Sequence, residues 1–280
     1  ADGPNIAAYA KRGYLTPLTS YLTDEEVSMF TAPMQDEIRY NGEIYGAAMG
    51  DSSLVMYYNT DLLEQAGITY DFSALSGDNR ITWEELVDIA KQVQSKLDPD
   101  GSQGLIGIEF QQVGRTYQMN VLANDLGGKN IADGGLSVDG IINAEPWTSA
   151  LNWYQTQVND GVFSKGIAAG DTSSYFMSDK IVFYLGTTAM PGTFASNNFD
   201  HYGFTYVPCF SGHEADVTTS CGSWTVGMNP YSEKVEAAVE FIKYLCLYDG
   251  ADVYINASGM VPALSGDNRI TWEELVDIAK

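Results

Sequence analysis

Short apolar runs alternate with amphipathic segments along this chain, and this alternation constrains the fold more than any other feature. Strand-like runs begin at Ile44 and Leu54, and a third, Leu105–Phe110, follows a polar turn. Between them, the hydroxyl of Thr82 and the carboxylate of Glu85 have the spacing of a capping box that opens a helix. Apolar residues then recur at helical spacing, at Leu86, Ile89, Ala90, Val93 and Leu97. Strands alternating with helices of this length predict an α/β fold.

Three more elements follow from the same patterns. The sequence predicts a short helix after Asn59 that ends at Gly67, because glycine commonly follows the last helical residue. Longer helices are expected over 145–158 and 232–248, the second with apolar residues on one face. A length of 280 residues, 45% of them hydrophobic, fits two modest lobes better than one small core.

The chain is strongly acidic, with 37 Asp and Glu against 14 Lys and Arg and a net charge of −23. Such a chain repels phosphate backbones and anionic lipid surfaces, which disfavours binding to nucleic acid or docking on a membrane. No apolar run approaches the roughly 20 residues of a membrane span.

Three cysteines are too few for a fold built on disulfides. Cys246 lies in an apolar run and is expected to be a buried thiol. Cys209 and Cys221 flank a polar stretch, so they either close this loop as a disulfide or remain thiols, and both alternatives stay open. With only His201 and His213 and no CxxC pair, no structural zinc site can be assembled. We predict no metal and no cofactor.

One segment occurs twice. Residues 74–91 and 263–280 are identical letter for letter, which diverged structural repeats would not be. We therefore interpret the second copy as a feature of engineering or assembly. It should form a helix from Thr271, because the capping residues are the same, and pack Trp272, Leu275 and Ile278 against the second lobe. No residue after Pro262 is expected to line the ligand site.

Several motifs stand in an order that is familiar from one family. They are Asp2-Gly-Pro-Asn with the following Tyr9-Ala-Lys-Arg-Gly, Met56-Tyr-Tyr-Asn-Thr-Asp-Leu-Leu-Glu-Gln-Ala-Gly, Phe176-Met-Ser-Asp-Lys, Cys221-Gly-Ser-Trp-Thr-Val-Gly and Ser258-Gly-Met-Val-Pro. Together they resemble the sugar-binding class of extracellular solute-binding proteins of ABC transporters (family 1, similar to maltose-binding proteins). Phe176-Met-Ser-Asp-Lys departs from the family pattern, since Asp179 replaces its glycine.

The resemblance implies a two-lobe fold of the periplasmic-binding-protein kind, similar to type II. The chain would cross between lobes near 51–54, 221–226 and 259–263. Residues 1–50 and 227–258 would form the first lobe and 53–222 the second, with 259–280 a crossing plus the duplicated tail. The family's βαβα stretch before Asp2 and its helices after Pro262 are absent from this chain, so we expect truncation at both ends and an incomplete first lobe.

The resemblance also implies where ligand contacts lie: at the crossings and at the edges of the lobes. The candidates are Asp2, Asn5, Asp51, Ser52, Gln111, Arg115, Tyr117, Phe194 and Trp224. Six of them have a structural alternative: Asn5 as a helix cap, Asp2 as a solvated carboxylate, Asp51 and Ser52 as turn residues, Phe194 and Trp224 as core rings. Sugars need aromatic rings for stacking and carboxylates, amides or arginine for their hydroxyls.

The expected function is therefore to bind a carbohydrate, such as an oligosaccharide, in a cleft between lobes and deliver it to the membrane permease subunits of an ABC importer. A monomer is expected, outside the cell, as a bacterial surface lipoprotein or in the periplasm. We expect a binder and not an enzyme, since no nucleophile elbow, P-loop or HExxH motif is present. Two alternatives remain: a glycoside hydrolase, whose carboxyl pair needs no short motif, and a binder of another polar solute such as a polyamine.

Overall fold

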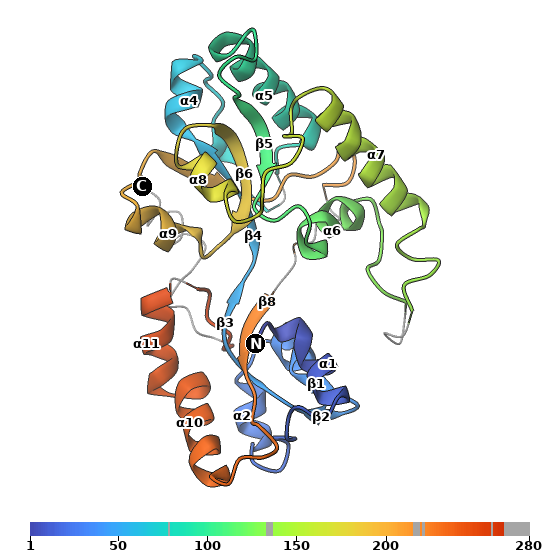
Figure 1. The fold of residues 1–280 in the computed structure, drawn as a ribbon, viewed down its shortest axis with the longest axis vertical. Helices are drawn as coiled ribbons and strands as arrows, with labels where there is room; N and C mark the ends of the chain where they lie inside the picture. Colours follow the sequence, from blue (N-terminus) through green and yellow to red (C-terminus); the bar gives the residue numbers. More distant parts are fainter. Residues whose placement is uncertain (78, 133–136, 215–218, 220–221, 259, 266–280) are drawn as a thin grey trace. The chain divides into compact units, whose positions relative to one another are not determined.

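The computed structural model describes residues 1–265 except 78, 133–136, 215–218, 220–221 and 259. They form two compact units, each with its own core (Figure 1). Unit 1 contains Ala1–Ser53, Thr188–Thr193 and, among the described residues, 222–265. Unit 2 contains Leu54–Thr187 and 194–219. The fold mixes helices and strands, as the sequence pattern predicts.

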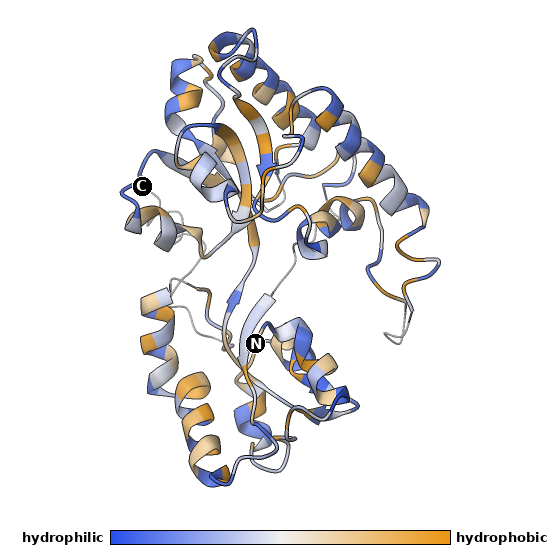
Figure 2. Ribbon diagram, in the orientation of Figure 1, coloured by the Kyte–Doolittle hydropathy of each residue, from blue (hydrophilic) through white to orange (hydrophobic). Residues whose placement is uncertain are grey.

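Unit 1 is built from short elements on the N-terminal side and two helices near the end of the described chain. Its elements are η1 (Gly3–Asn5), α1 (Ile6–Lys11), α2 (Asp24–Ser28), α3 (Ala32–Glu37), β1 (Arg39–Tyr40), β2 (Glu43–Ile44), β3 (Ala47–Ser52), β8 (Gly222–Val226), α10 (Val235–Leu247) and α11 (Asp249–Ser258). β1 pairs with β2, and β3 pairs with β8, both antiparallel. In α10 the residues Val239, Ile242 and Cys246 are buried, and Figure 2 shows this helix as predominantly hydrophobic.

Unit 2 is built on a larger sheet. Its elements are β4 (Leu54–Asn59), α4 (Thr60–Gln65), η2 (Phe72–Ala74), α5 (Trp83–Leu97), β5 (Ile106–Phe110), α6 (Thr116–Asp125), α7 (Glu145–Asn159), α8 (Thr172–Phe176), β6 (Ile181–Thr187) and β7 (Tyr202–Thr205), and α9 (Met190–Ser196) is divided between the units. The strand order is β5-β6-β4-β7, with β5 parallel to β6 and β4 antiparallel to both of its neighbours.

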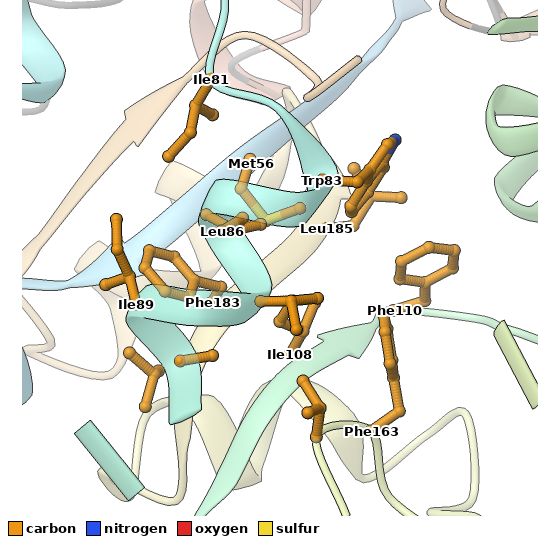
Figure 3. Packing of buried hydrophobic residues seen from close by; sticks show 14 of the residues in the cluster. Met56, Ile81, Trp83, Leu86, Ile89, Ile108, Phe110, Phe163, Phe183 and Leu185 are labelled. Carbon is orange, nitrogen blue, oxygen red and sulfur yellow. The ribbon is translucent and has the colours of Figure 1, made fainter. Parts of the chain in front are cut away.

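The core of unit 2 lies between the sheet and α5. Figure 3 shows Trp83, Leu86 and Ile89 of α5 packed beside Phe183 and Leu185 of β6. All of these side chains are buried, and the strand β6 is buried along nearly its whole length (Ile181–Gly186). A strand buried on both faces reads as a continuous apolar run, which explains the sequence pattern at 181–185.

Local signals predicted the helix ends well. The hydroxyl of Thr82 accepts from Glu85 N (3.1 Å) and the Glu85 carboxylate accepts from Thr82 N (3.0 Å), which confirms the capping box. Asn59 caps α4 by accepting from Leu62 N (2.9 Å), and Gly67 follows this helix with a φ of +65°. These bonds connect residues close in sequence, so no tertiary information was needed to expect them.

The two identical segments begin in different surroundings. Ala74 of the first copy is exposed in unit 2, whereas Ala263 of the second is buried in unit 1 and accepts a hydrogen bond from Thr31 N (3.0 Å). Ser265 N likewise donates to Met29 O (2.6 Å). The predicted tail helix from Thr271, and its packing, fall outside the described residues.

Candidate functional site

Trp224 is presented by β8 with much of its ring accessible. Side chains alternate between the two faces of a strand. Ser223 and Thr225 are 3% and 1% exposed, whereas Trp224 is 49% exposed and lies on the other face of the strand. Its neighbour across the ladder is Gly50 of β3, and a β-bridge on the opposite side joins it to Asp2. The structure therefore leaves the Trp224 ring available for stacking and does not use it as a core residue.

Three segments meet at Asp51. Its backbone N donates to Val261 O (2.7 Å) and its carbonyl accepts from Val261 N (3.0 Å). Its carboxylate accepts from Ser52 N (2.7 Å) and Gly222 N (3.2 Å), and the Ser52 hydroxyl donates to Gly222 O (3.0 Å). Asp51 and Ser52 thus hold β3, β8 and residue 261 side by side. These are the segments that the sequence assigns to crossings, and they are neighbours within unit 1.

Asp2 and Asn5 occupy cap positions without using their side chains as caps. Asp2 precedes η1 and Asn5 precedes α1, but neither side chain accepts a capping hydrogen bond, and both residues are exposed. Asn5 therefore stands at the cap position of α1, but its side chain does not cap the helix. The bridge from Asp2 to Trp224 places Asp2 on the Trp224 face, because directly opposed residues share a face.

Glu37 joins this group although the sequence gave no reason to single it out. Its carboxylate accepts from the Ser223 hydroxyl (2.5 Å), which also lies 2.7 Å from the Thr225 hydroxyl. Burial raises the pKa of Glu37, the hydrogen bond from Ser223 opposes the rise, and the negative charges of Asp51 and Asp2 add to it. Gly3 permits this approach, since a Cβ there would overlap both Glu37 and Ser223. Glu37 ends α3 far from β8 in sequence, so only the tertiary structure reveals the contact.

The second group of predicted residues lies in unit 2, at the sheet edge where β5 and β6 end and β4 begins. The Gln111 side chain accepts from Thr187 N (3.0 Å), and Gln111 N donates to Leu185 O (2.9 Å). The Gln111 amide thus supports the end of β6. Carboxyl ends of parallel strands commonly present ligand-binding residues in α/β folds. Leu54, the first residue of unit 2, pairs with Thr187 at the same edge.

Arg115 and Tyr117 follow Gln111 into α6. Arg115 is exposed at the helix start and its side chain forms no cap. Tyr117 is half-buried, and its hydroxyl donates to Gln112 Oε1 (3.1 Å) and accepts from Gln118 Nε2 (3.3 Å). The structure thus places Gln111, Arg115 and Tyr117 together in unit 2, and Asp2, Asn5, Asp51, Ser52 and Trp224 together in unit 1.

Phe194 belongs to neither group. It is fully buried, and its ring contacts those of Tyr57, Phe176, Phe199 and Tyr202 at centroid distances of 4.7–5.5 Å. A ring enclosed by four others has no face left for a ligand. The expectation of a ligand contact at Phe194 is therefore corrected, and the core alternative holds.

The cysteine pair is also corrected in part. Cys209 is a buried free thiol whose Sγ donates to Ile81 O (3.8 Å), and burial raises its pKa to about 11. This free thiol argues against the disulfide alternative, and the predicted partner, Cys221, lies outside the described residues. Cys246 is buried and free, as predicted.

Neither metal ligands nor a membrane helix stands out in the part of the chain that the structure describes. There, no three His, Cys, Asp or Glu side chains are grouped as a metal ion would require. Nor is any helix among those residues long and apolar enough to cross a membrane.

Solved structures share this fold. An ABC substrate-binding protein from Listeria monocytogenes in complex with cycloalternan superposes with a TM-score of 0.78 at 20% identity, covering 100% of this chain and 70% of the other. A maltose-bound protein of T. maritima gives the same TM-score and identity over 99% and 70%. These likenesses establish the two-lobe solute-binding fold.

Curated relatives are also similar in sequence. The lactose-binding protein of Rhizobium radiobacter is 28% identical over 81% of this chain and 51% of its own length. The sn-glycerol-3-phosphate-binding periplasmic protein of Rhizobium meliloti is 23% identical over 91% and 54%. The chain thus spans about half the length of these relatives. Residues 1–268 match the family of bacterial extracellular solute-binding proteins, and since the match covers nearly the whole sequence, this chain belongs to that family.

Proposed function

We propose that this protein binds a carbohydrate, in particular an oligosaccharide, and delivers it to the membrane permease subunits of an ABC importer. The observation that carries the proposal is the accessible Trp224 ring on β8, whose backbone pairs with that of Asp2. An aromatic ring can stack on the C–H face of a sugar while carboxylates accept from its hydroxyls. The family membership and the lactose-binding relative support the same ligand class.

Both groups of site residues are proposed to contact the ligand. In unit 1 Trp224 supplies stacking, and Asp2, Asn5, Asp51 and Ser52 supply polar contacts. In unit 2 Gln111, Arg115 and Tyr117 supply amide, guanidinium and phenol groups, the kinds of donor and acceptor that a sugar rim uses.

A polyamine or another organic cation is the second candidate, and a specific observation favours it. Asp2, Glu37 and Asp51 lie close enough for the charges of the two aspartates to raise the pKa of Glu37. Concentrated negative charge attracts a cation more strongly than it does a neutral sugar. The exposed Trp224 ring is compatible with either ligand, since it can stack on a sugar or hold a cation over its face.

The protein is further proposed to act as a monomer outside the cell, as a surface lipoprotein or in the periplasm, and to release its ligand unaltered. Glycoside hydrolysis would instead need two carboxyl groups on either side of the scissile bond. Ligand that is recovered intact after long incubation supports binding without turnover.

Isothermal titration with lactose, maltose and spermidine tests the ligand class. We expect saturable binding of at least one sugar, no binding of spermidine, and no new products by chromatography after the incubation. Tight binding of spermidine without binding of any sugar would show that the ligand is an organic cation. Cleavage of a sugar would show that the protein is an enzyme.

A further inference from the structure

We propose a second saccharide-binding site in unit 2, in a pocket between α4 and η2 that is lined by Tyr58, Tyr70 and Phe72 together with Glu64 and Asp71. The pocket has a volume of about 420 Å³. This is within the range of about 300–1,000 Å³ typical of small-molecule sites. None of the residues proposed above to contact the transported ligand lines it.

Two of the aromatic rings that line the pocket are closely packed. Tyr58 stacks on Phe72 with ring centroids 4.3 Å apart and an interplanar angle of 20°. Gly203 of β7 lies directly against the Tyr58 ring, because a Cβ at this glycine would overlap the ring atoms. Rings held in this way contribute contact area with little loss of side-chain entropy on binding.

Tyr70 supplies the accessible surface. Its ring is 36% exposed and lies 4.7 Å from Phe72 at an angle of 48°. Both tyrosines pack on the Phe72 ring, which differs from an aromatic cage, whose rings stand apart around an ammonium group. An exposed ring flank fits instead the flat C–H face of a sugar ring.

Carboxylates line the rim. Glu64 on α4 and Asp71 before η2 are both exposed, and Asp71 is oriented by bonds that it accepts from Ser73 N (3.0 Å) and Ser73 Oγ (2.6 Å). Carboxylates accept strongly from sugar hydroxyls. No Lys, Arg or His is among the lining residues, so a neutral sugar is favoured over a phosphorylated one.

The pocket is separate from the Gln111 edge of the same sheet. β4 enters unit 2 at Leu54, at that edge, and reaches the pocket at Tyr58. Four residues of strand correspond to about 13 Å. Occupation of the two places can therefore be measured independently.

Titration of the ¹⁵N-labelled protein with lactose and with maltose, followed by amide chemical shifts, tests the proposal. We expect millimolar sugar to shift the amides of Gly67 and Thr69. Tyr70→Ala should weaken this binding about tenfold or more, and Glu64→Ala several-fold. Tyr175→Ala, which removes another exposed tyrosine of unit 2, is the matched control and should leave it unchanged.

Unperturbed Gly67 and Thr69 amides at saturating sugar would overturn the proposal, as would equal binding by the Tyr70→Ala variant. Shifts caused by choline and not by sugars would assign the pocket to a cation instead. Failure of the transported-ligand proposal would show at Trp224 and Gln111, whose signals are separate.

Discussion

Unit 1 and unit 2 position their candidate ligand residues by different kinds of contact. In unit 2 the sheet whose edge carries Gln111 is surrounded by packed aromatic rings. Those of Tyr57, Trp83 and Phe194 are all nearly or fully buried. In unit 1 the strand carrying Trp224 is tied to Glu37 through the hydroxyls of Ser223 and Thr225. The unit 2 edge should therefore respond mainly to lost volume, and the unit 1 edge to lost polar contacts and to charge.

The largest effect is expected from Phe194→Ala. Removing a ring that contacts four others leaves a cavity, so the free energy of unfolding should fall by about 3–5 kcal/mol. Urea denaturation followed by near-ultraviolet circular dichroism measures the loss. A variant of normal stability that fails to bind ligand would instead place the ring in the site and undo the correction made above.

Trp224→Ala should weaken sugar binding by about 1–3 kcal/mol, because the stacking surface is lost. Its stability should fall by only about 1 kcal/mol, since half of the side chain is already exposed. Calorimetric titration measures the affinity, and Tyr231→Ala, at an 88% exposed ring, is the control. Unchanged affinity for every sugar tested would remove Trp224 from the site.

Ser223→Ala should destabilise the protein by about 1–2 kcal/mol, because Glu37 then loses the donor that offsets part of its burial. The pKa of Glu37 should rise further, which carboxyl ¹³C shifts across a pH titration would report. Ser232→Ala, at a partly exposed site in the same unit, provides the comparison. If the pKa of Glu37 stays where it is, the hydroxyl is not its principal donor.

Glu109→Gln should give the smallest effect and a distinctive pH dependence. Glu109 is 1% exposed, and burial raises its pKa although it accepts from Phe110 N and the Ser164 hydroxyl. The unfolded chain therefore ionises this group at lower pH than the folded one. Its stabilising contribution is fully present below the ordinary pKa of a glutamate. It is lost as the pH rises through the raised pKa of Glu109 in the folded chain.

The stability of Glu109→Gln relative to wild type should thus increase as the pH rises above about 4, the ordinary pKa of a glutamate. Melting temperatures across this range measure the difference, and it would show that polar burial matters in unit 2 as well. A difference that is flat with pH would mean that folding does not change the pKa of Glu109, contrary to the expected effect of its burial.

Much of the fold was accessible from local patterns. The capping box at Thr82, the cap at Asn59 and the glycine at 67 all connect residues within a few positions of each other. The apolar face of α5 follows from helical periodicity, and the continuous apolar run at 181–185 is typical of a buried strand such as β6. The motif order from Asp2 to Pro262 predicted the family, which the match over residues 1–268 confirms.

The site was accessible only in part. The sequence singled out Asp51, Ser52 and Trp224 by resemblance, and the structure brings them together with Asp2. The sequence did not indicate Glu37. Its hydrogen-bond partner Ser223 is far away in sequence, and no local pattern marks Gly3 as the residue that lets the carboxylate approach. The sequence misassigned Phe194, because an aromatic residue after a strand looks the same whether it packs inward or faces a ligand.

The repeated segment separates the two kinds of information most clearly. The sequence by itself determined which residues can start a helix at Thr82, because a capping box is a local arrangement of hydroxyl, carboxylate and amide. Only the tertiary structure decided that Ala263 is buried in unit 1 while the identical Ala74 is exposed in unit 2. Burial depends on which other segments of the chain pack against a residue, and the local sequence of the repeat does not determine this.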